Sequence, residues 1–244
     1  MVREDERGIH PEGIAAVLAR ISLGRVGNSL PTKELLAFQL AHAKARDAVW
    51  NELDCTFSVH GCTLNVHSQA KDRAEFLRRP DLGRRIAHPD LLQKGDFDAV
   101  IILADGLSAT AVHRHAGQVV DALLPLLDGW KLAPIVIAQQ ARVAISDEVG
   151  ELLGAKMSVI LIGERPGLSS PDSLGAYLTW APRIGRNDAE RNCVSNIREE
   201  GLTPVLAAHR IAMLMKAARG QEISGVTLKT STERLVGHAA RELP

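Results

Sequence analysis

The sequence predicts an α/β fold, in which a mainly parallel, Rossmann-like sheet is flanked by helices. Short apolar runs rich in β-branched residues recur in the second half of the chain, each followed by turn residues and a helical pattern. The run over residues 159–162 has no polar side chain and is ended by Gly163, which is typical of a strand buried on both faces. We expect an α-rich N-terminal region over residues 1–90 and an α/β domain over residues 91–244.

Before residue 90 the pattern is mostly helical. The expected elements are a short helix, a loop, a longer helix, a strand and a second helix, over residues 14–21, 23–31, 32–50, 63–67 and 71–79. Ser29 or Thr32 can cap the longer helix, and Pro80 ends the last one. Leu36 and Leu40 give the longer helix an apolar face at helical spacing.

After residue 90 strands and helices alternate. The strands are expected over residues 97–104, 135–138, 159–162 and 174–180, and the helices over residues 108–127, 146–154 and 204–219. Ser146 can cap the second of these helices and Gly154 can end it. The third helix carries apolar residues around most of its circumference, so we expect it to be well buried, with Gly220 as its stop. Residues 183–192 are expected to form a charged loop.

Composition limits the possible partners and compartments. The 244 residues fit one large domain, or a medium domain with an appendage. The basic residues (Lys and Arg) and the acidic residues (Asp and Glu) each number 29, so the charge does not suggest nucleic acid or a membrane as a partner. A net charge near zero also favours association with other protein chains. Three cysteines without a Cys-x-x-Cys pair favour a reducing cytoplasm.

Few residues offer chemistry by themselves. The turn over residues 105–108 lies between a strand and a helix and can present backbone N–H groups to an anion, but neither Gly-x-Gly-x-x-Gly nor a phosphate-binding loop is present. Ser108 is expected to be a helix cap rather than a nucleophile. His113 and His115 do not face the same way on a helix, which favours surface histidines over metal ligands. The sequence therefore gives no catalytic residue and no metal ligand.

Two further features leave alternatives open. Glu164 would lie at the carboxyl end of a strand, where ligands bind in α/β sheets, or it belongs to a solvated turn with an internal ion pair. Four arginines surround a Pro/Gly turn over residues 78–85, and they either pair with nearby acids or form a docking surface for another subunit. Cys193 taken alone is expected to be a packed thiol.

Several motifs in a fixed order resemble one family, the small subunit of ethanolamine ammonia-lyase. The clearest are Leu-Ile-Gly-Glu-Arg-Pro-Gly-Leu at residues 161–168 and Cys-Val-Ser-Asn-Ile at residues 193–197. The others lie over residues 20–32, 42–49, 67–73, 79–85, 104–109 and 150–154. The resemblance runs from about residue 20 to the end of the chain.

The resemblance implies a subunit of an adenosylcobalamin-dependent enzyme that converts ethanolamine to acetaldehyde and ammonia. A large (β/α)₈-barrel subunit performs the chemistry, and the small subunit holds cobalamin against it. The cofactor contacts of the family fall on Val143, Glu164 and Cys193. It also implies an assembly of six large and six small subunits, in the cytoplasm or in a bacterial microcompartment. The alternative, from a different class, is a stand-alone ligand-binding or regulatory module on a Rossmann-like fold, without a catalytic partner.

Overall fold

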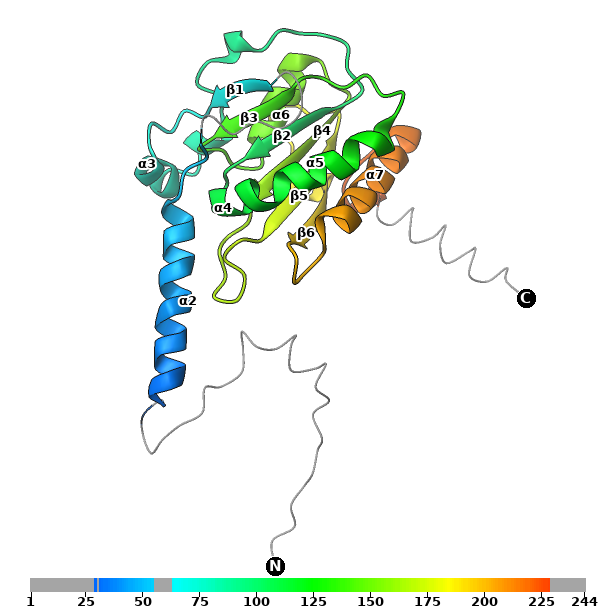
Figure 1. Cartoon of the computed structure of the whole chain (residues 1–244). Coiled ribbons are helices and arrows are strands. Elements are labelled where there is room, and N and C mark those ends of the chain that lie inside the picture. The colour runs from blue at the N-terminus through cyan, green and yellow to red at the C-terminus, as the bar shows by residue number, and fades with distance from the viewer. Residues whose placement is uncertain (1–28, 30, 55–62, 229–244) are drawn as a thin grey trace, which may run out of the picture.

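A six-stranded mixed sheet forms the centre of the computed structural model, which describes residues 29, 31–54 and 63–228 (Figure 1). The strands are β1 (Thr63–His67), β2 (Val100–Ala104), β3 (Ile135–Gln139), β4 (Met157–Gly163), β5 (Leu174–Trp180) and β6 (Arg191–Ile197). Their order in the sheet is β1-β3-β2-β4-β5-β6, in which the first four strands are parallel to one another and β5 is antiparallel to both of its neighbours, β4 and β6. The α/β class is therefore confirmed, but the sheet is partly antiparallel, and the Rossmann-like arrangement remains a prediction.

Helices cover both faces of this sheet. The helices of the described chain are α2 (Thr32–Trp50), α3 (Arg73–Arg78), α4 (Ala109–Ala111), α5 (Gly117–Leu123), α6 (Ile145–Leu153) and α7 (Pro204–Gln221). Of these, α5 and α7 pack on one face of the sheet and α6 on the other. A π-helical turn, η3 (Val112–Ala116), joins α4 to α5. Four short 3₁₀ turns complete the described chain, namely η1 (Leu82–Arg84), η2 (Pro89–Leu91), η4 (Leu124–Leu127) and η5 (Asp188–Glu190).

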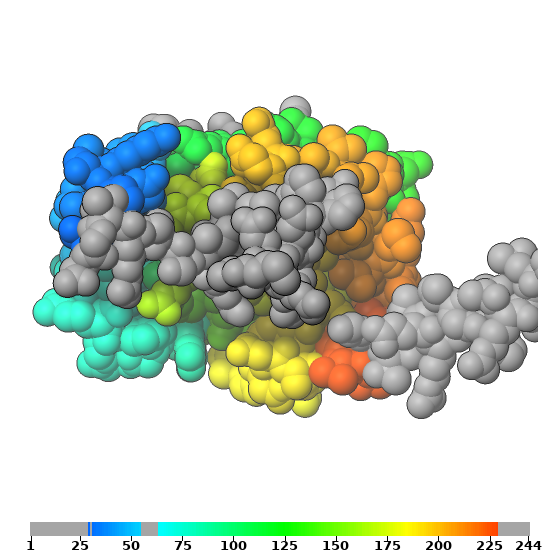
Figure 2. Space-filling view, turned by 90° about the horizontal axis from the view of Figure 1, so that it is seen from below, coloured from blue at the N-terminus to red at the C-terminus, as the bar shows by residue number. Residues whose placement is uncertain are grey.

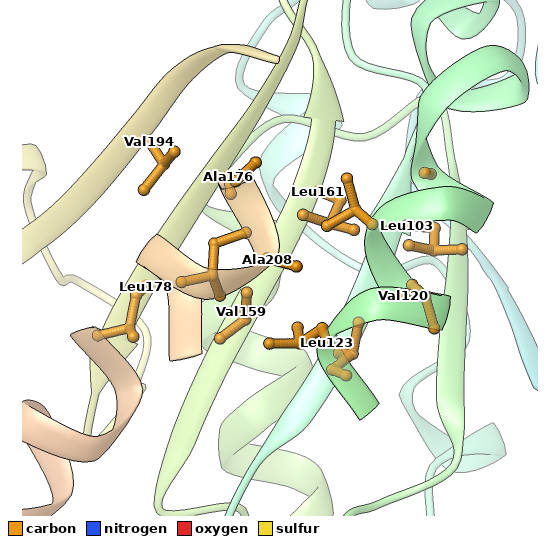
Figure 3. Packing of buried hydrophobic residues seen from close by; sticks show 14 of the residues in the cluster. Leu103, Val120, Leu123, Val159, Leu161, Ala176, Leu178, Val194 and Ala208 are labelled. Carbon is orange, nitrogen blue, oxygen red and sulfur yellow. The ribbon is translucent and has the colours of Figure 1, made fainter. Parts of the chain in front are cut away.

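The alternation of side chains along the strands divides the core into two layers. Leu103 and Leu161 belong to the cluster that packs under α5 and α7, which Figure 3 shows from close by. Ile102 and Ile160, one residue away on the same strands, belong to the cluster that includes α6. Because β2 and β4 are buried on both faces, their sequences read as continuous apolar runs.

Most of the expected elements are present, but two caps differ. β1 and β5 have the expected bounds, and Gly154 ends α6 in a left-handed conformation with φ of 68°. Pro31 is the N-cap of α2, so neither Ser29 nor Thr32 caps it. Ser146 lies inside α6, and its hydroxyl donates to the Val143 carbonyl at 2.8 Å instead of capping the helix. The helix expected over residues 14–21 lies outside the described residues.

The last helix is less buried than its composition predicted. Its buried residues lie along one side and are mostly alanines, whereas Val205 and Leu206 are exposed. Gly220 lies within α7, which continues to Gln221 and ends where Glu222 adopts a left-handed conformation. The prediction of burial around most of the circumference is therefore wrong, because only one side of the helix, where alanines lie beside Ile211 and Met215, packs into the core.

Strand β6 was not expected, since residues 183–192 read as a charged loop. Arg191 and Asn192 open this strand, and both are buried. A β-bulge interrupts its pairing with β5, between the pairs Ala176–Val194 and Leu174–Ile197. This bulge breaks the alternation of apolar residues that would have marked the strand.

Strand β1 and helix α2 both come from the first 90 residues, but only β1 is part of the sheet. β1 lies within the first 90 residues, yet it pairs with β3 from Thr63–Ile135 to His67–Gln139 and so belongs to the same sheet. The division at residue 90 remains a prediction. In Figure 1, α2 projects from the body, and in Figure 2, which looks along this direction, its blue atoms lie at one edge of the molecule. Along its 19 residues only Ala48 is buried.

Candidate functional site

The candidate site lies where β4 ends, on the face of the sheet that also carries α6. Tyr177 on β5 pairs with Ile160 on one side and with Cys193 on the other. Paired residues in adjacent strands point to the same face. Ile160 belongs to the cluster that packs against α6, so Tyr177 and Cys193 lie on the same face of the sheet as α6.

Glu164 directly follows β4 and is held by two hydrogen bonds to one carboxylate oxygen. Its Oε2 accepts from Ser173 Oγ at 2.5 Å and from the backbone N–H of Asn196 at 3.3 Å. The backbone N–H of Glu164 also donates to the Ser173 carbonyl at 2.9 Å. Glu164 is half-buried, and these partners take the place of the internal ion pair with Arg165 that the turn sequence allowed. The carboxylate is therefore fixed and turned toward β5 and β6.

Cys193 lies within β6 rather than in a loop, and its side chain is exposed, so the expectation of a packed thiol is wrong. Tyr177 lies directly opposite it on β5 and points to the same face of the sheet. Desolvation by the surrounding protein raises the pKa of the Cys193 thiol, and the nearby Glu164 carboxylate acts in the same direction. Cys193 is thus a neutral thiol at neutral pH, which suits contact with a ligand and not nucleophilic attack.

Tyr177 lies between the other two groups. Burial is the largest cause that raises the pKa of its hydroxyl, followed by the charge of Cys193 and the hydrogen bond between them. Glu164 raises this pKa further. Its carboxylate lies against Gly175, which is two residues before Tyr177 on the same face of β5. The structure therefore brings Glu164 and Cys193 together around Tyr177.

Val143 precedes α6 and packs, half-buried, against the apolar cluster that Tyr177 also contacts. Its carbonyl accepts hydrogen bonds from the backbone and side chain of Ser146, which fixes the entry to the helix. Val143 therefore belongs to the same layer as Glu164 and Cys193, at its apolar side.

A buried ion pair ties α6 to β6. The two terminal nitrogens of the Arg191 guanidinium, Nη1 and Nη2, donate to the two Asp147 carboxylate oxygens at 2.7 Å, and both side chains are 2% exposed. Arg191 also donates to Thr179 Oγ1 and to the Arg186 carbonyl. Burial disfavours the charged guanidinium, but the hydrogen bonds and charge of Asp147 outweigh this and raise the pKa of Arg191. The pair is thus ionised, and it fixes the strand of Cys193 against the helix that follows Val143.

The turn over residues 105–108 does not offer its amides to an anion. The N–H groups of Leu107 and Ser108 donate to the carbonyls of Gly163 and Asp105. Asp105 is buried and accepts from the backbone N–H groups of Gln140 and Ala141, both at 2.9 Å. Ser108 caps α4, as expected, by accepting from the Ala111 N–H. This turn therefore serves to hold the ends of β2, β3 and β4 together.

The histidines and arginines singled out by the sequence differ in burial and in their partners. His113 is exposed, but His115 is buried in η3, which the expectation of surface histidines did not foresee. Arg85 makes two hydrogen bonds of 3.1 Å to Glu148 on α6, and Arg79 pairs with Asp81. Within residues 29, 31–54 and 63–228, no group of three or more His, Cys, Asp or Glu is arranged to hold a metal ion. The helices of this part of the chain are also too short or too polar to cross a membrane.

Sequence reasoning did not find the residues that support Glu164. Ser173 lies 9 residues after it, across the connection from β4 to β5, and Asn196 lies 32 residues after it. Both meet it, as Gly175 does, only through the register of β4, β5 and β6. The register is set by long-range pairing, so no local signal marks them.

Comparison with known proteins places these features in a family context. The family model described as ethanolamine ammonia-lyase light chain matches residues 14–229. An ethanolamine ammonia-lyase small subunit from Pseudomonas aeruginosa (strain UCBPP-PA14) is 52% identical over 241 aligned residues, which cover 91% of this chain and 88% of that protein. Proteins of the same name from Ralstonia nicotianae and Azotobacter vinelandii are each 52% identical, and their alignments cover 88% of this chain and 86% of each relative.

Proposed function

This chain belongs to the ethanolamine ammonia-lyase light chain family, and from this premise we propose that it holds adenosylcobalamin against the large subunit through Val143, Glu164 and Cys193. The enzyme of this family converts ethanolamine to acetaldehyde and ammonia. The observation that carries the proposal is that β5 and β6 bring Glu164 and Cys193 to one face of the sheet beside Tyr177. The comparisons support the small subunit and lend nothing to a stand-alone binding module.

The chemistry of these side chains suits cobalamin. The rim of a corrin carries amide groups, whose N–H donors a carboxylate such as Glu164 accepts. Cys193 offers a neutral thiol, and Val143 an apolar surface for the ring system. When bound, adenosylcobalamin supplies the radical that starts deamination on the large subunit. The residues of this chain bind and orient the cofactor and take no part in proton transfer.

The proposal includes an assembly with the large subunit, which the name of the relatives implies. Six large and six small subunits in the cytoplasm, or in a bacterial microcompartment, are the arrangement we propose. The projecting helix α2 supports a protein contact, because apolar side chains exposed together on a surface are typical of such contacts. The exposed apolar residues of this helix include Leu35, Leu36, Phe38 and Leu40.

Reconstitution tests this function directly. We expect no ethanolamine deamination from this chain alone and full activity when it is combined with the large subunit and adenosylcobalamin. Glu164→Gln in the complex should weaken cofactor binding by about tenfold, because a hydrogen bond to a charged group is replaced by one to a neutral amide. The rate at saturating cofactor should change much less. Unchanged cofactor affinity together with a collapsed saturated rate would refute the binding role of Glu164.

A further inference from the structure

We infer that Ser173, Gly175 and the bulged backbone at Asn196 are positioning elements, which hold the Glu164 carboxylate so that its Oε1 atom faces the cofactor. The inference rests on the proposed function and adds to it the residues that set the direction of this acceptor. Three observations on the described residues carry it: the hydrogen bonds to Oε2, the space above Gly175, and the anchoring of Ser173.

Both hydrogen bonds that the described chain makes to the Glu164 side chain end on the same oxygen. Ser173 Oγ donates to Oε2 at 2.5 Å, and the Asn196 N–H donates to it at 3.3 Å. Asn196 has a φ of 57° at the bulge of β6, and this irregular backbone releases its N–H from the strand ladder. With Oε2 held from two sides, the lone pairs of Oε1 have a defined direction and are left to accept a donor from a ligand.

Gly175 provides the space in which this carboxylate lies. A Cβ atom at this position would be 2.8 Å from Glu164 Oε1 and 3.1 Å from its Cγ. The backbone of Gly175 is outside the left-handed region, so its conformation would accept alanine. The absence of a side chain is therefore required by the carboxylate of Glu164 and not by the turn of the chain.

Ser173 is itself fixed by the helical layer on the other side of the sheet. Its neighbour Asp172 accepts a hydrogen bond from Arg114 at 2.7 Å, and the Pro171 carbonyl accepts one from Ser108 Oγ at 2.8 Å. Ser173 is 6% exposed, so its hydroxyl has little freedom to follow a displaced carboxylate. The position of Oε1 is thus set by contacts that reach from α4 and η3 to β6.

The test uses the complex of this chain with the large subunit and measures adenosylcobalamin affinity by titration. Gly175→Ala moves the Glu164 carboxylate without changing its chemistry, and Ser173→Ala removes one of its two anchors. Each should weaken cofactor binding by about three- to tenfold, with the rate at saturating cofactor retained. Ser158→Ala is the matched control, because it removes a buried hydroxyl of β4 that has no hydrogen-bond partner among the described residues. It should leave the affinity unchanged.

Combination with Glu164→Ala separates positioning from general damage to the fold. If Gly175 and Ser173 act through Glu164, their alanine variants should cause no further loss of affinity once that side chain is absent. A loss of the same size in both backgrounds, or none in either, would overturn the inference while leaving the contact by Glu164 intact. If Glu164→Ala alone leaves the affinity unchanged, both the inference and the binding role proposed for Glu164 are wrong.

Discussion

Replacement of Asp147 by asparagine should destabilise this chain more than the loss of any surface ion pair. The substitution keeps the shape of the side chain but removes the charge that Arg191 needs. Arg191 would then be a buried cation, since both side chains of the pair are 2% exposed. Thr179 and the Arg186 carbonyl still accept from it but carry no charge. The remaining carboxylate, Asp188, lies 3.5 Å from Arg191 Nε, but its side chain is fully exposed and solvent screens its charge.

The size of the effect follows from this burial. Breaking a buried ion pair by neutralising one partner costs about 3–5 kcal/mol, because the remaining charge stays desolvated, and the exposed Asp188 carboxylate places the expected loss toward the lower end of this range. With a denaturant slope of roughly 2–3 kcal/mol per M, the midpoint of urea unfolding should fall by about 1–2 M. Replacing both partners, as in Asp147→Leu with Arg191→Met, should cost less than the single change, because no unpaired charge is left.

Urea unfolding of the isolated chain, followed by tryptophan fluorescence, measures these values. Asp81→Asn is the matched control, because Arg79 and Asp81 have a similar two-bond geometry, at 3.0 and 2.7 Å, while their side chains are 60% and 58% exposed. This variant should have an almost unchanged midpoint, since solvent screens an exposed pair. A midpoint for Asp147→Asn equal to that of Asp81→Asn would refute the reasoning, as would a double variant less stable than the single one.

Two further predictions concern single groups. Tyr177 is the one tyrosine of the chain, and burial together with Cys193 raises its pKa above that of a free phenol. The stability that this raised pKa represents should be complete below the ordinary phenol pKa and be lost as the pH rises through the pKa of Tyr177 in the folded protein. Tyrosinate absorbance in an alkaline titration measures this pKa. Ionisation at the pKa of a free phenol would contradict the prediction. Arg85→Glu should lower the thermal midpoint, because it places a second carboxylate against the buried Glu148, whereas the exposed Arg84→Glu should not. Equal effects of the two reversals, measured by thermal unfolding, would show that the Arg85–Glu148 pair has no structural role.

The sequence predicted those strands whose own residues form a continuous apolar run or an alternating apolar pattern. β4 was expected over residues 159–162 and extends over Met157–Gly163, because a strand between two helical layers needs apolar side chains on both faces. The alternation over residues 63–67 was enough to place β1 with its observed bounds.

β6 was missed because polar residues open it. Arg191 is buried by its ion pair with Asp147, and Asn192 by two hydrogen bonds with the backbone of Gly225. Partners this far along the chain leave no local pattern, so a strand with polar buried positions reads as a loop. The same limit explains the error for α7, where alanines rather than the larger Val205 and Leu206 face the sheet.

The residues of the candidate site also fall into two groups, those found from the sequence and those found only in the structure. Val143, Glu164 and Cys193 were singled out through a family resemblance, and their role remains a proposal. Ser173 and Tyr177 came only from the structure, because they reach these residues through strand register and not through spacing along the chain.

The place of β1 at the edge of the sheet has a consequence for synthesis on the ribosome. β3, its one neighbour in the described sheet, begins at Ile135, whereas β1 ends at His67. At about 5–20 residues per second, the nascent chain exposes β1 for several seconds before its pairing strand emerges. During that time its backbone N–H and C=O groups are open to other nascent chains, so slower translation between β1 and β3 should increase aggregation, and binding of a chaperone to residues 63–67 should reduce it.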